Sequence, residues 1–217
     1  MNYSNIYLVG EKKLVDEWKL LLEKYSIPIS SQVERNSIVI ELTICNIEQK
    51  KKNISTLSDK TCLPIFSTSV VNTISEQVTW TQNKNLIGIS AFPTLTHNHL
   101  IEVAFLHNYD IDENFQFIEN FFLALQKKIS IVKDSVGMVF PRIVSMLINE
   151  AFFTYEENVA SKDDIDLAMK LGTNYPFGLF EWCETIGSEN IVKILETLNE
   201  SNANERYKIS QMLLKNK

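Results

Sequence analysis

The residues best suited to metal or proton chemistry lie close together near position 100. His97 and His99 stand two residues apart, and Glu102 follows them. Imidazole and carboxylate groups are ordinary zinc ligands, but two histidines in a polar loop are far more often solvated, so we expect no metal site. Glu102 falls within the apolar run LIEVAFL. If it is buried there it needs a raised pKa or a hydrogen-bond partner such as Ser90 or Thr68.

Cysteine spacing and charge exclude two other classes of site. Cys45, Cys62 and Cys183 are odd in number and show no Cys-x-x-Cys spacing, which predicts neither a disulfide framework nor a zinc site. The formal net charge is −6, and the one dense basic run, residues 50–52, is short. We therefore expect no nucleic-acid partner.

No stretch of the sequence has the length and apolar character of a membrane span, which needs about 18 or more apolar residues. The N-terminus, MNYSNIYLVGEKK, lacks the basic start and apolar block of a signal peptide. These patterns predict a cytoplasmic protein with no membrane partner.

The first part of the chain alternates between apolar, strand-like runs and segments with the apolar period of a helix. Strands are predicted at residues 5–9, 37–44, 63–69, 85–92, 100–106 and 129–134, and helices at about 11–24, 46–57, 72–78 and 112–127. This alternation favours a parallel sheet flanked by helices.

After Gly137 the strand signals stop. Helices are predicted at about 141–157, 161–171, 178–185 and 188–200. Ser161 is suited to cap a helix start, and Gly172 to follow a helix end. We therefore predict two domains: α/β over residues 1–134, as a reduced Rossmann-like parallel sheet, and all-α over residues 135–217.

The helical part carries a recognisable series of motifs. GMVFPRIVSMLINEAFFTYEE is followed by NVASKDDIDLAMKLGTNYPFGLFEWCETIG. This order resembles the C-terminal domain of the 3-hydroxyacyl-CoA dehydrogenases, in which Gly-Phe-x-x-Asn-Arg precedes Asn-Glu-Ala, Asp-Ile-Asp-x-Ala and Gly-Tyr-Pro-x-Gly-Pro-Phe-Glu. The resemblance implies a helical domain that forms a symmetric homodimer and closes a cleft for acyl-CoA.

The resemblance extends into the first part of the chain. IVIELTICNIEQKKKNISTLS (38–58) resembles a family segment that places Lys50 in step with a motif lysine. STSVV (67–71) places Ser69 on the serine that contacts the substrate oxygen. GISAFPTLTHNHLIEVAF (88–105) places Glu102 on the catalytic glutamate.

Two positions depart from the family's catalytic pattern. The same register puts Ser90 where the catalytic histidine belongs, a role that needs a group titrating near neutral pH. Pro141 replaces the asparagine that polarises the reacting oxygen, and proline has no donor to offer. Proline suits the first turn of a helix, so this change preserves the fold while removing a catalytic group.

The cofactor loop also departs from the family. A dinucleotide fold needs Gly-x-Gly-x-x-Gly after its first strand, whereas VGEKKLVDEW keeps Gly10 alone. Too few residues follow to build the adenine-binding half before the next strand. Gly10 and Lys50 then remain as vestiges of a cofactor site. No cofactor is expected, with NAD implied only if the family activity is retained.

Three functions are compatible with these patterns. The first is a catalytically inactive relative that binds an acyl-CoA-like ligand or a protein partner. The second is an active or residual NAD-dependent 3-hydroxyacyl-CoA dehydrogenase of fatty-acid metabolism, in which Glu102 and Ser69 act as the acid–base pair. The third is a dimeric structural subunit that supports an active paralogue. Side chains of residues 11–14 filling the phosphate pocket would favour the first, and an intact pocket the second.

Overall fold

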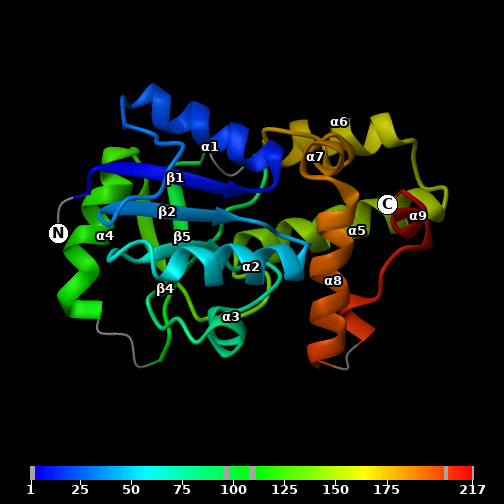
Figure 1. Ribbon diagram of the computed structural model, residues 1–217. Helices are drawn as coiled ribbons and strands as arrows, with labels where there is room; N and C mark the ends of the chain where they lie inside the picture. The colour runs from blue at the N-terminus through cyan, green and yellow to red at the C-terminus, as the bar shows by residue number, and fades with distance from the viewer. Residues whose placement is uncertain (1–2, 95–97, 108–110, 203–204, 217) are drawn as a thin grey trace. The chain divides into compact units, whose positions relative to one another are not determined.

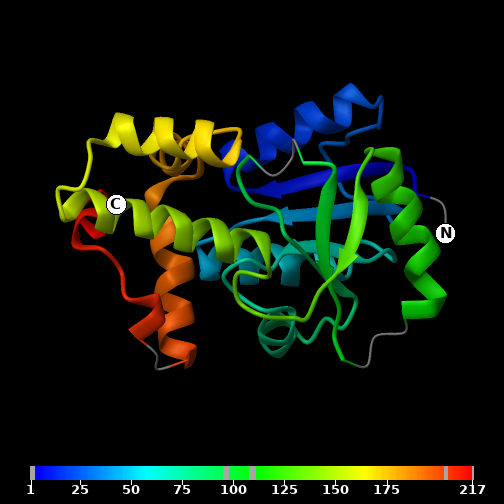
Figure 2. The same cartoon turned by 180° about the vertical axis from the view of Figure 1, so that it is seen from behind.

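The computed structural model describes residues 3–94, 98–107, 111–202 and 205–216. The chain forms two compact units, Met1–Met138 and Val139–Lys217, each with its own core (Figures 1 and 2). The domain limits inferred from the sequence, 1–134 and 135–217, remain a prediction.

The first unit contains one six-stranded sheet, which confirms the predicted α/β class. All neighbouring strands pair in parallel except β4 and β5, which are antiparallel. A parallel pair would need a long crossover, and the segment between these two strands is short. The strands are β1 (Asn5–Gly10), β2 (Ser37–Leu42), β3 (Ile65–Thr68), β4 (Leu86–Ile89), β5 (Leu100–Ala104) and β6 (Lys128–Ile131).

The strand order follows the chain from β1 to β6 without a reversal. β1 is therefore an outer strand of the sheet, and an isolated bridge between Ile6 and Ile29 lies beyond it. Doubly wound folds bind dinucleotides where the strand order reverses. The strands that the structure describes do not form such a reversal.

Helices cover both faces of this sheet. They are α1 (Lys12–Lys24), α2 (Ile47–Ser58), α3 (Ile74–Thr81) and α4 (Ile111–Ala124). Phe66 of β3 packs against two phenylalanines of α4, with ring centroids 5.2 and 5.3 Å away. The next residue, Ser67, contacts side chains of α2 and α3. Because successive strand residues face opposite sides, α4 lies on one face and α2 and α3 on the other.

Helix α1 has the apolar spacing of an amphipathic helix, and helix α2 begins at a residue that caps it. In α1, Leu14, Trp18 and Leu22 recur every four residues and are buried, as one face of a helix requires. In α2, the side chain of Asn46 accepts a hydrogen bond from the amide of Gln49, a standard helix cap. Local sequence therefore determines both the position and the orientation of these helices.

The second unit is helical, as predicted. Its elements are α5 (Phe140–Glu156), α6 (Lys162–Thr173), α7 (Leu179–Ile186), α8 (Ser188–Asn202), the short 3₁₀ helix η2 (Glu205–Tyr207) and α9 (Gln211–Lys215). Ser161 caps α6 as expected. The predicted end of α6 at Leu171 is wrong: Gly172 lies inside the helix, and Asn174 adopts the left-handed conformation at its end, with φ 56°. Asparagine is one of the few residues that tolerate that conformation.

Motif residues of the second unit hold its helices together. The carboxylate of Asp166 on α6 accepts hydrogen bonds from the amides of Phe180 and Glu181, at 2.8 and 3.1 Å, at the start of α7. A Cβ at Gly178 would lie 2.2 Å from the carboxyl carbon of Asp166, so only glycine permits this approach. The Asp-Ile-Asp and Pro-Phe-Gly motifs therefore have a structural explanation.

Asn149, from the Asn-Glu-Ala motif, anchors the C-terminal segment. Its side-chain nitrogen donates to the carbonyl of Lys208 at 2.9 Å, and its oxygen accepts from the amide of Ser210 at 3.0 Å. Glu156 accepts from the hydroxyl of Ser210 and from the amide of Met212. These polar contacts order backbone that has no sheet or helix partner of its own.

Within the described ranges, no helix combines the length and the apolar character that crossing a membrane would require.

Candidate functional site

Three predicted site residues lie on neighbouring strands of the sheet. Ser69 directly follows β3, Ser90 directly follows β4, and Glu102 lies within β5. The amide of Ser69 donates to the carbonyl of Ile89 at 3.0 Å, and the amide of Ser90 donates to the carbonyl of Glu102 at 3.0 Å. All three residues are buried. The structure thus brings together residues that are far apart in the sequence, and their role as site residues stays a prediction.

Ser90 meets Glu102 through the backbone. The hydroxyl oxygen of Ser90 accepts a hydrogen bond of 3.0 Å from the amide of Glu102. The hydroxyl of Thr68, the other expected partner, donates to the carbonyl of Ala91 at 2.7 Å. Ser90 therefore stabilises the β4–β5 pair, and a serine hydroxyl does not titrate near neutral pH as a histidine does.

Ser69 and Gln77 both contact the backbone of Asn72, whose side chain is unusual among the buried polar groups. The hydroxyl of Ser69 donates to the carbonyl of Asn72 at 3.2 Å, and the side-chain nitrogen of Gln77 donates to the same carbonyl at 2.8 Å. The side-chain oxygen of Asn72 is buried and has no hydrogen-bond partner within the described ranges. A buried acceptor without a partner is costly, so this oxygen is suited to a donor from a ligand or a water molecule.

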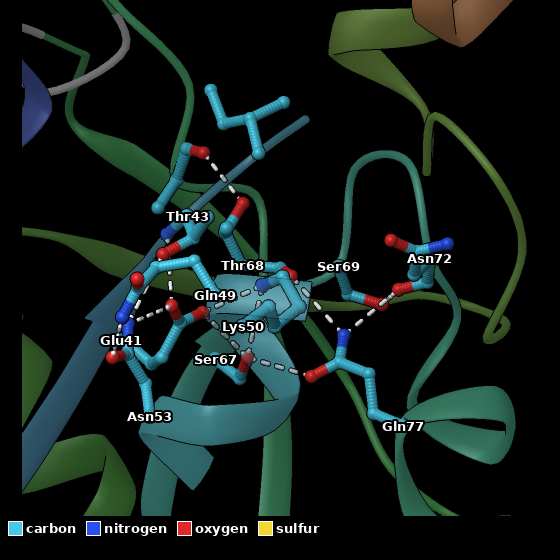
Figure 3. A network of polar contacts seen from close by, with 12 residues as sticks. Glu41, Thr43, Gln49, Lys50, Asn53, Ser67, Thr68, Ser69, Asn72 and Gln77 are labelled. Atoms are coloured by element: carbon cyan, nitrogen blue, oxygen red, sulfur yellow. Dashed lines mark hydrogen bonds and ion pairs between the residues drawn. The ribbon is translucent and has the colours of Figure 1, made fainter. Parts of the chain in front are cut away.

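Lys50 lies within a network of polar contacts that includes Glu41, Ser67 and Thr68 (Figure 3). Its ammonium nitrogen lies 2.6 Å from Glu41 Oε2, 2.9 Å from the carbonyl of Thr68 and 3.3 Å from the hydroxyl of Ser67. The other carboxylate oxygen of Glu41 accepts from Asn53 at 3.2 Å. Lys50 therefore donates to internal groups of the protein.

The charge of Lys50 depends on this network. Burial lowers the pKa of Lys50, and the adjacent carboxylate of Glu41 opposes that shift. The charge of Glu11 also favours the protonated form and so opposes the lowering of the pKa. With a side chain only 1% exposed, Lys50 has a structural role that is sufficient to explain its presence, because a buried cation needs a partner of opposite charge.

Gly10 is explained by the close packing of β1 against β2. It adopts a φ of +138°, and a Cβ there would lie 2.4 Å from the carbonyl carbon of Leu42. Both the conformation and the space favour glycine. This requirement exists without any bound phosphate.

The side chain of Glu11 occupies the end of β2. Its carboxylate accepts hydrogen bonds from the amides of Ile44 and Cys45, at 2.7 and 3.1 Å, just before α2. These two amides lie two and three residues before Ile47, where α2 begins, and an anion approaching them would meet this carboxylate. A carboxylate of the protein itself thus takes the place that a negatively charged ligand could occupy.

These features do not fit the pyrophosphate loop of a dinucleotide fold. In such a loop, backbone amides face a doubly charged group, whereas here a carboxylate of the chain lies at the same edge of the sheet. Leu14, which would follow the loop, is 1% exposed and part of the core.

The remaining predicted residues lie elsewhere. Pro141 is buried in the first turn of α5, in the second unit, as its lack of an N–H predicts. His99 and His107 are exposed, and His97 lies outside the described residues. Across the described part of the chain, no three histidine, cysteine or acidic side chains are grouped in a way that could hold a metal ion.

Comparison with known proteins agrees with these motifs. The sequence model of the family described as 3-hydroxyacyl-CoA dehydrogenase, C-terminal domain, matches residues 137–217. The 3-hydroxyadipyl-CoA dehydrogenase of Escherichia coli (strain K12) is 42% identical over 82 residues, which cover 38% of this chain and 17% of that protein. The mitochondrial hydroxyacyl-coenzyme A dehydrogenase of Homo sapiens is 30% identical over 181 residues, covering 80% of this chain and 56% of that protein.

The fold has a similar counterpart among solved structures. The (S)-3-hydroxybutyryl-CoA dehydrogenase from Ralstonia eutropha superposes with a TM-score of 0.77 at 21% identity, over 99% of this chain and 93% of that chain. The chain belongs to the 3-hydroxyacyl-CoA dehydrogenase family, with the family's C-terminal helical domain following a Rossmann-like domain. Its matches span 17% to 57% of the length of the first curated relatives.

Two residues of this site were not predicted from the sequence. The sequence indicates Glu11 only as one of the residues 11–14 that could fill the loop, and it does not predict the hydrogen bonds from the amides of residues 44 and 45. No sequence pattern indicates Asn72 as a site residue. The only sequence signal for Asn72 is a polar residue between a buried strand and a helix start, which is common at turns.

Proposed function

We propose that this protein binds an acyl-CoA thioester through the polar group formed by Ser69, Asn72, Ser90 and Glu102. The observation that carries the proposal is the placement of Ser69 and Ser90 directly after β3 and β4 and of Glu102 within β5, with the buried oxygen of Asn72 lacking a partner among the described residues. A carbonyl oxygen of this kind can accept from a hydroxyl or amide N–H of the ligand. The ligand class comes from the family to which the chain belongs.

One candidate outcome of binding is oxidation or reduction of a 3-hydroxyacyl-CoA or 3-ketoacyl-CoA thioester. The names of the relatives support it, since each is called a dehydrogenase of this class. In this candidate, Glu102 is the proton-handling group and Ser69 contacts the substrate oxygen. Both side chains are buried, which strengthens the electrostatic effect of each on a bound substrate.

The second candidate is binding without turnover. It is favoured by the geometry around Glu11, whose carboxylate accepts hydrogen bonds from the amides of residues 44 and 45. It is also favoured by Ser90. Its hydroxyl oxygen accepts a hydrogen bond from the amide of Glu102 and cannot replace an imidazole as a base. Under this candidate, Gly10, Lys50 and Pro141 serve only the fold.

A binding and turnover experiment separates the candidates. Thermal unfolding is measured with acetoacetyl-CoA, with CoA alone, with NADH and with NAD. A ligand present at about 100 times its dissociation constant adds about 2.7 kcal/mol to the free energy of unfolding. Stabilisation by acetoacetyl-CoA is expected under both candidates, and Asn72→Asp, which introduces a negative charge beside the ligand, should weaken it. Stabilisation by NADH with NADH consumption would select the first candidate, and its absence the second.

We also propose that the chain forms a homodimer through its helical part, residues 135–217. Leu167 and Leu171 on α6 support this, since they are 52% and 77% exposed and stand four residues apart on one helical face. Exposed apolar groups of this size are typical of an interface.

A further inference from the structure

A pocket of about 230 Å³ lies within the first unit, apart from the polar group described above. Three chain segments form it: the second half of α1, the residues just before β5, and the turn between α4 and β6. Its volume is below the range of about 300–1,000 Å³ that is usual for drug-sized ligands. A ligand of this pocket must therefore be small.

Two lysines line the pocket. Lys24 ends α1 and is exposed, whereas Lys127 is 3% exposed and donates to the carbonyl of Asn98 at 2.5 Å. Burial lowers the pKa of Lys127 to about 8, and the positive charge of Lys24 lowers it further. Two like charges facing one small volume repel each other, and an anion between them would relieve that repulsion.

The charge balance of the lining selects a singly charged anion. Glu17 also lines the pocket, and its carboxylate accepts from the amide of Thr94 at 3.2 Å. The lining contains two lysines and one glutamate, a balance of one positive charge. A monoanion neutralises this charge, whereas a phosphate dianion exceeds it.

The rest of the lining is apolar. Leu20, Leu21 and Leu125 form what we call the leucine wall, and Leu20 is 68% exposed although it is a large apolar residue. Tyr25 also lines the pocket, and the ammonium nitrogen of Lys24 lies 5.3 Å from the centroid of its ring. A pocket with a cationic end and an apolar wall suits a ligand with one charged group and a hydrocarbon body.

A smaller void adjoins the pocket at Lys127. It measures about 10 Å³ and is also lined by Trp18 and Ser90, so it could hold about one water molecule. The indole nitrogen of Trp18 is buried and has no hydrogen-bond partner within the described ranges. A donor in this state is costly unless water or a ligand reaches it. A water molecule in the void would satisfy this donor.

We propose that this pocket binds a small organic carboxylate, whose charged group meets Lys24 and Lys127 and whose hydrocarbon lies on the leucine wall. Lys127 anchors the polar end, because its position is fixed by burial and by Asn98. Lys24 supplies the second, exposed cation. The residues that line this pocket differ from those of the proposed acyl-CoA site, although the adjoining void reaches Ser90.

Calorimetric titration of the full chain with hexanoate tests the proposal. Hexanamide, which has nearly the same shape but no charge, should bind at least tenfold more weakly than hexanoate. Lys24→Met should weaken hexanoate binding at least fivefold, because it removes one cation and leaves the apolar surface. Lys60→Met serves as the matched control, since Lys60 is exposed and does not line the pocket.

Several results would overturn the proposal. These are no binding of hexanoate, equal binding of hexanamide, equal binding of inorganic phosphate, or full binding by Lys24→Met. Leu20→Ser provides a second variant at an exposed position. It should weaken the binding of hexanoate more than the binding of acetate. Acetoacetyl-CoA stabilisation measured on Lys24→Met should equal that of the unaltered protein, so failure of the two proposals can be told apart.

Discussion

The ammonium nitrogen of Lys50 lies 2.6 Å from a carboxylate oxygen of Glu41, and both side chains are almost completely buried. The pair connects β2 to α2, and its members reach β3 through Ser67 and Thr68. A lysine that resembles a motif residue of a dehydrogenase family thus has an internal structural role. Its loss should affect stability before it affects ligand binding.

Lys50→Met tests this role. The change leaves the carboxylate of Glu41 buried without its cation, and breaking one side of a buried pair costs about 3–5 kcal/mol. The double variant Lys50→Met/Glu41→Gln should recover part of that loss. Urea unfolding measures both. Lys51→Met is the matched control: its pair with Glu48 is exposed, so its loss should cost under about 1 kcal/mol. A Lys50→Met protein as stable as the control would refute the structural role.

Gly10→Ala should destabilise the protein by about 2 kcal/mol or more with no ligand present. The added Cβ would lie 2.4 Å from the carbonyl carbon of Leu42, and the backbone has a φ of +138°, which is strained for alanine. Gly172→Ala is the control, since nothing lies within 4 Å of its Cβ position inside α6. That change should be neutral or stabilise by up to about 1 kcal/mol. If both variants unfold at the same urea concentration, the packing argument fails.

Lys127 should contribute a gain in stability between pH 8 and pH 10, whereas the pKa of the buried Cys183 thiol, raised to about 12, acts in the opposite direction. The pKa of Lys127 is lowered to about 8 in the folded protein, whereas the unfolded chain keeps its proton up to about pH 10.4. In this interval Lys127 binds more protons in the unfolded state, so its contribution to the free energy of unfolding increases with pH. The charged or titratable groups facing Lys127 in the pocket are Lys24, Glu17 and His99.

Lys127→Met isolates this contribution. Its unfolding free energy should rise less over the same pH interval than that of the unaltered protein, and the difference should be on the order of 1 kcal/mol or more. The comparison is needed because burial lowers the pKa of Lys50 in the same direction. Identical pH profiles for the two proteins would show that Lys127 keeps an ordinary pKa.

Leu171→Glu should convert the proposed dimer into a monomer. A charge placed at this apolar position would have to be desolvated in an interface, which costs several kcal/mol. Analytical ultracentrifugation measures the mass. Leu123→Glu on α4 is the control, because Leu123 is also exposed, at 49%, but lies in the other unit. A Leu171→Glu protein that stays dimeric would place the interface elsewhere.

The sequence predicted the elements better than their arrangement. Alternating apolar runs predicted all six strands, because burial on both faces leaves a local signal. The antiparallel direction of β5 was not predicted, since strand pairing depends on contacts that no local pattern records. The end of α6 was misplaced by two residues because glycine is the usual helix terminator, whereas here Asn174 has that role.

For the site too, the sequence predicted which residues are involved better than it predicted their arrangement. The resemblance indicated Ser69, Ser90 and Glu102, and the structure places them on neighbouring strands. The resemblance did not indicate that the hydroxyl of Ser90 would accept a hydrogen bond from the amide of Glu102. The orientation of a side chain depends on how whole strands pack, which the motifs do not record. The pocket around Lys127 could not be foreseen either, since its walls come from three distant segments.

Thermal unfolding with and without acetoacetyl-CoA tests the central claim most directly, with CoA alone as the comparison. The account predicts a higher unfolding temperature with the thioester than with CoA, and a smaller increase for Asn72→Asp. An unfolding temperature that acetoacetyl-CoA leaves unchanged at millimolar concentration would contradict an acyl-CoA site in this chain.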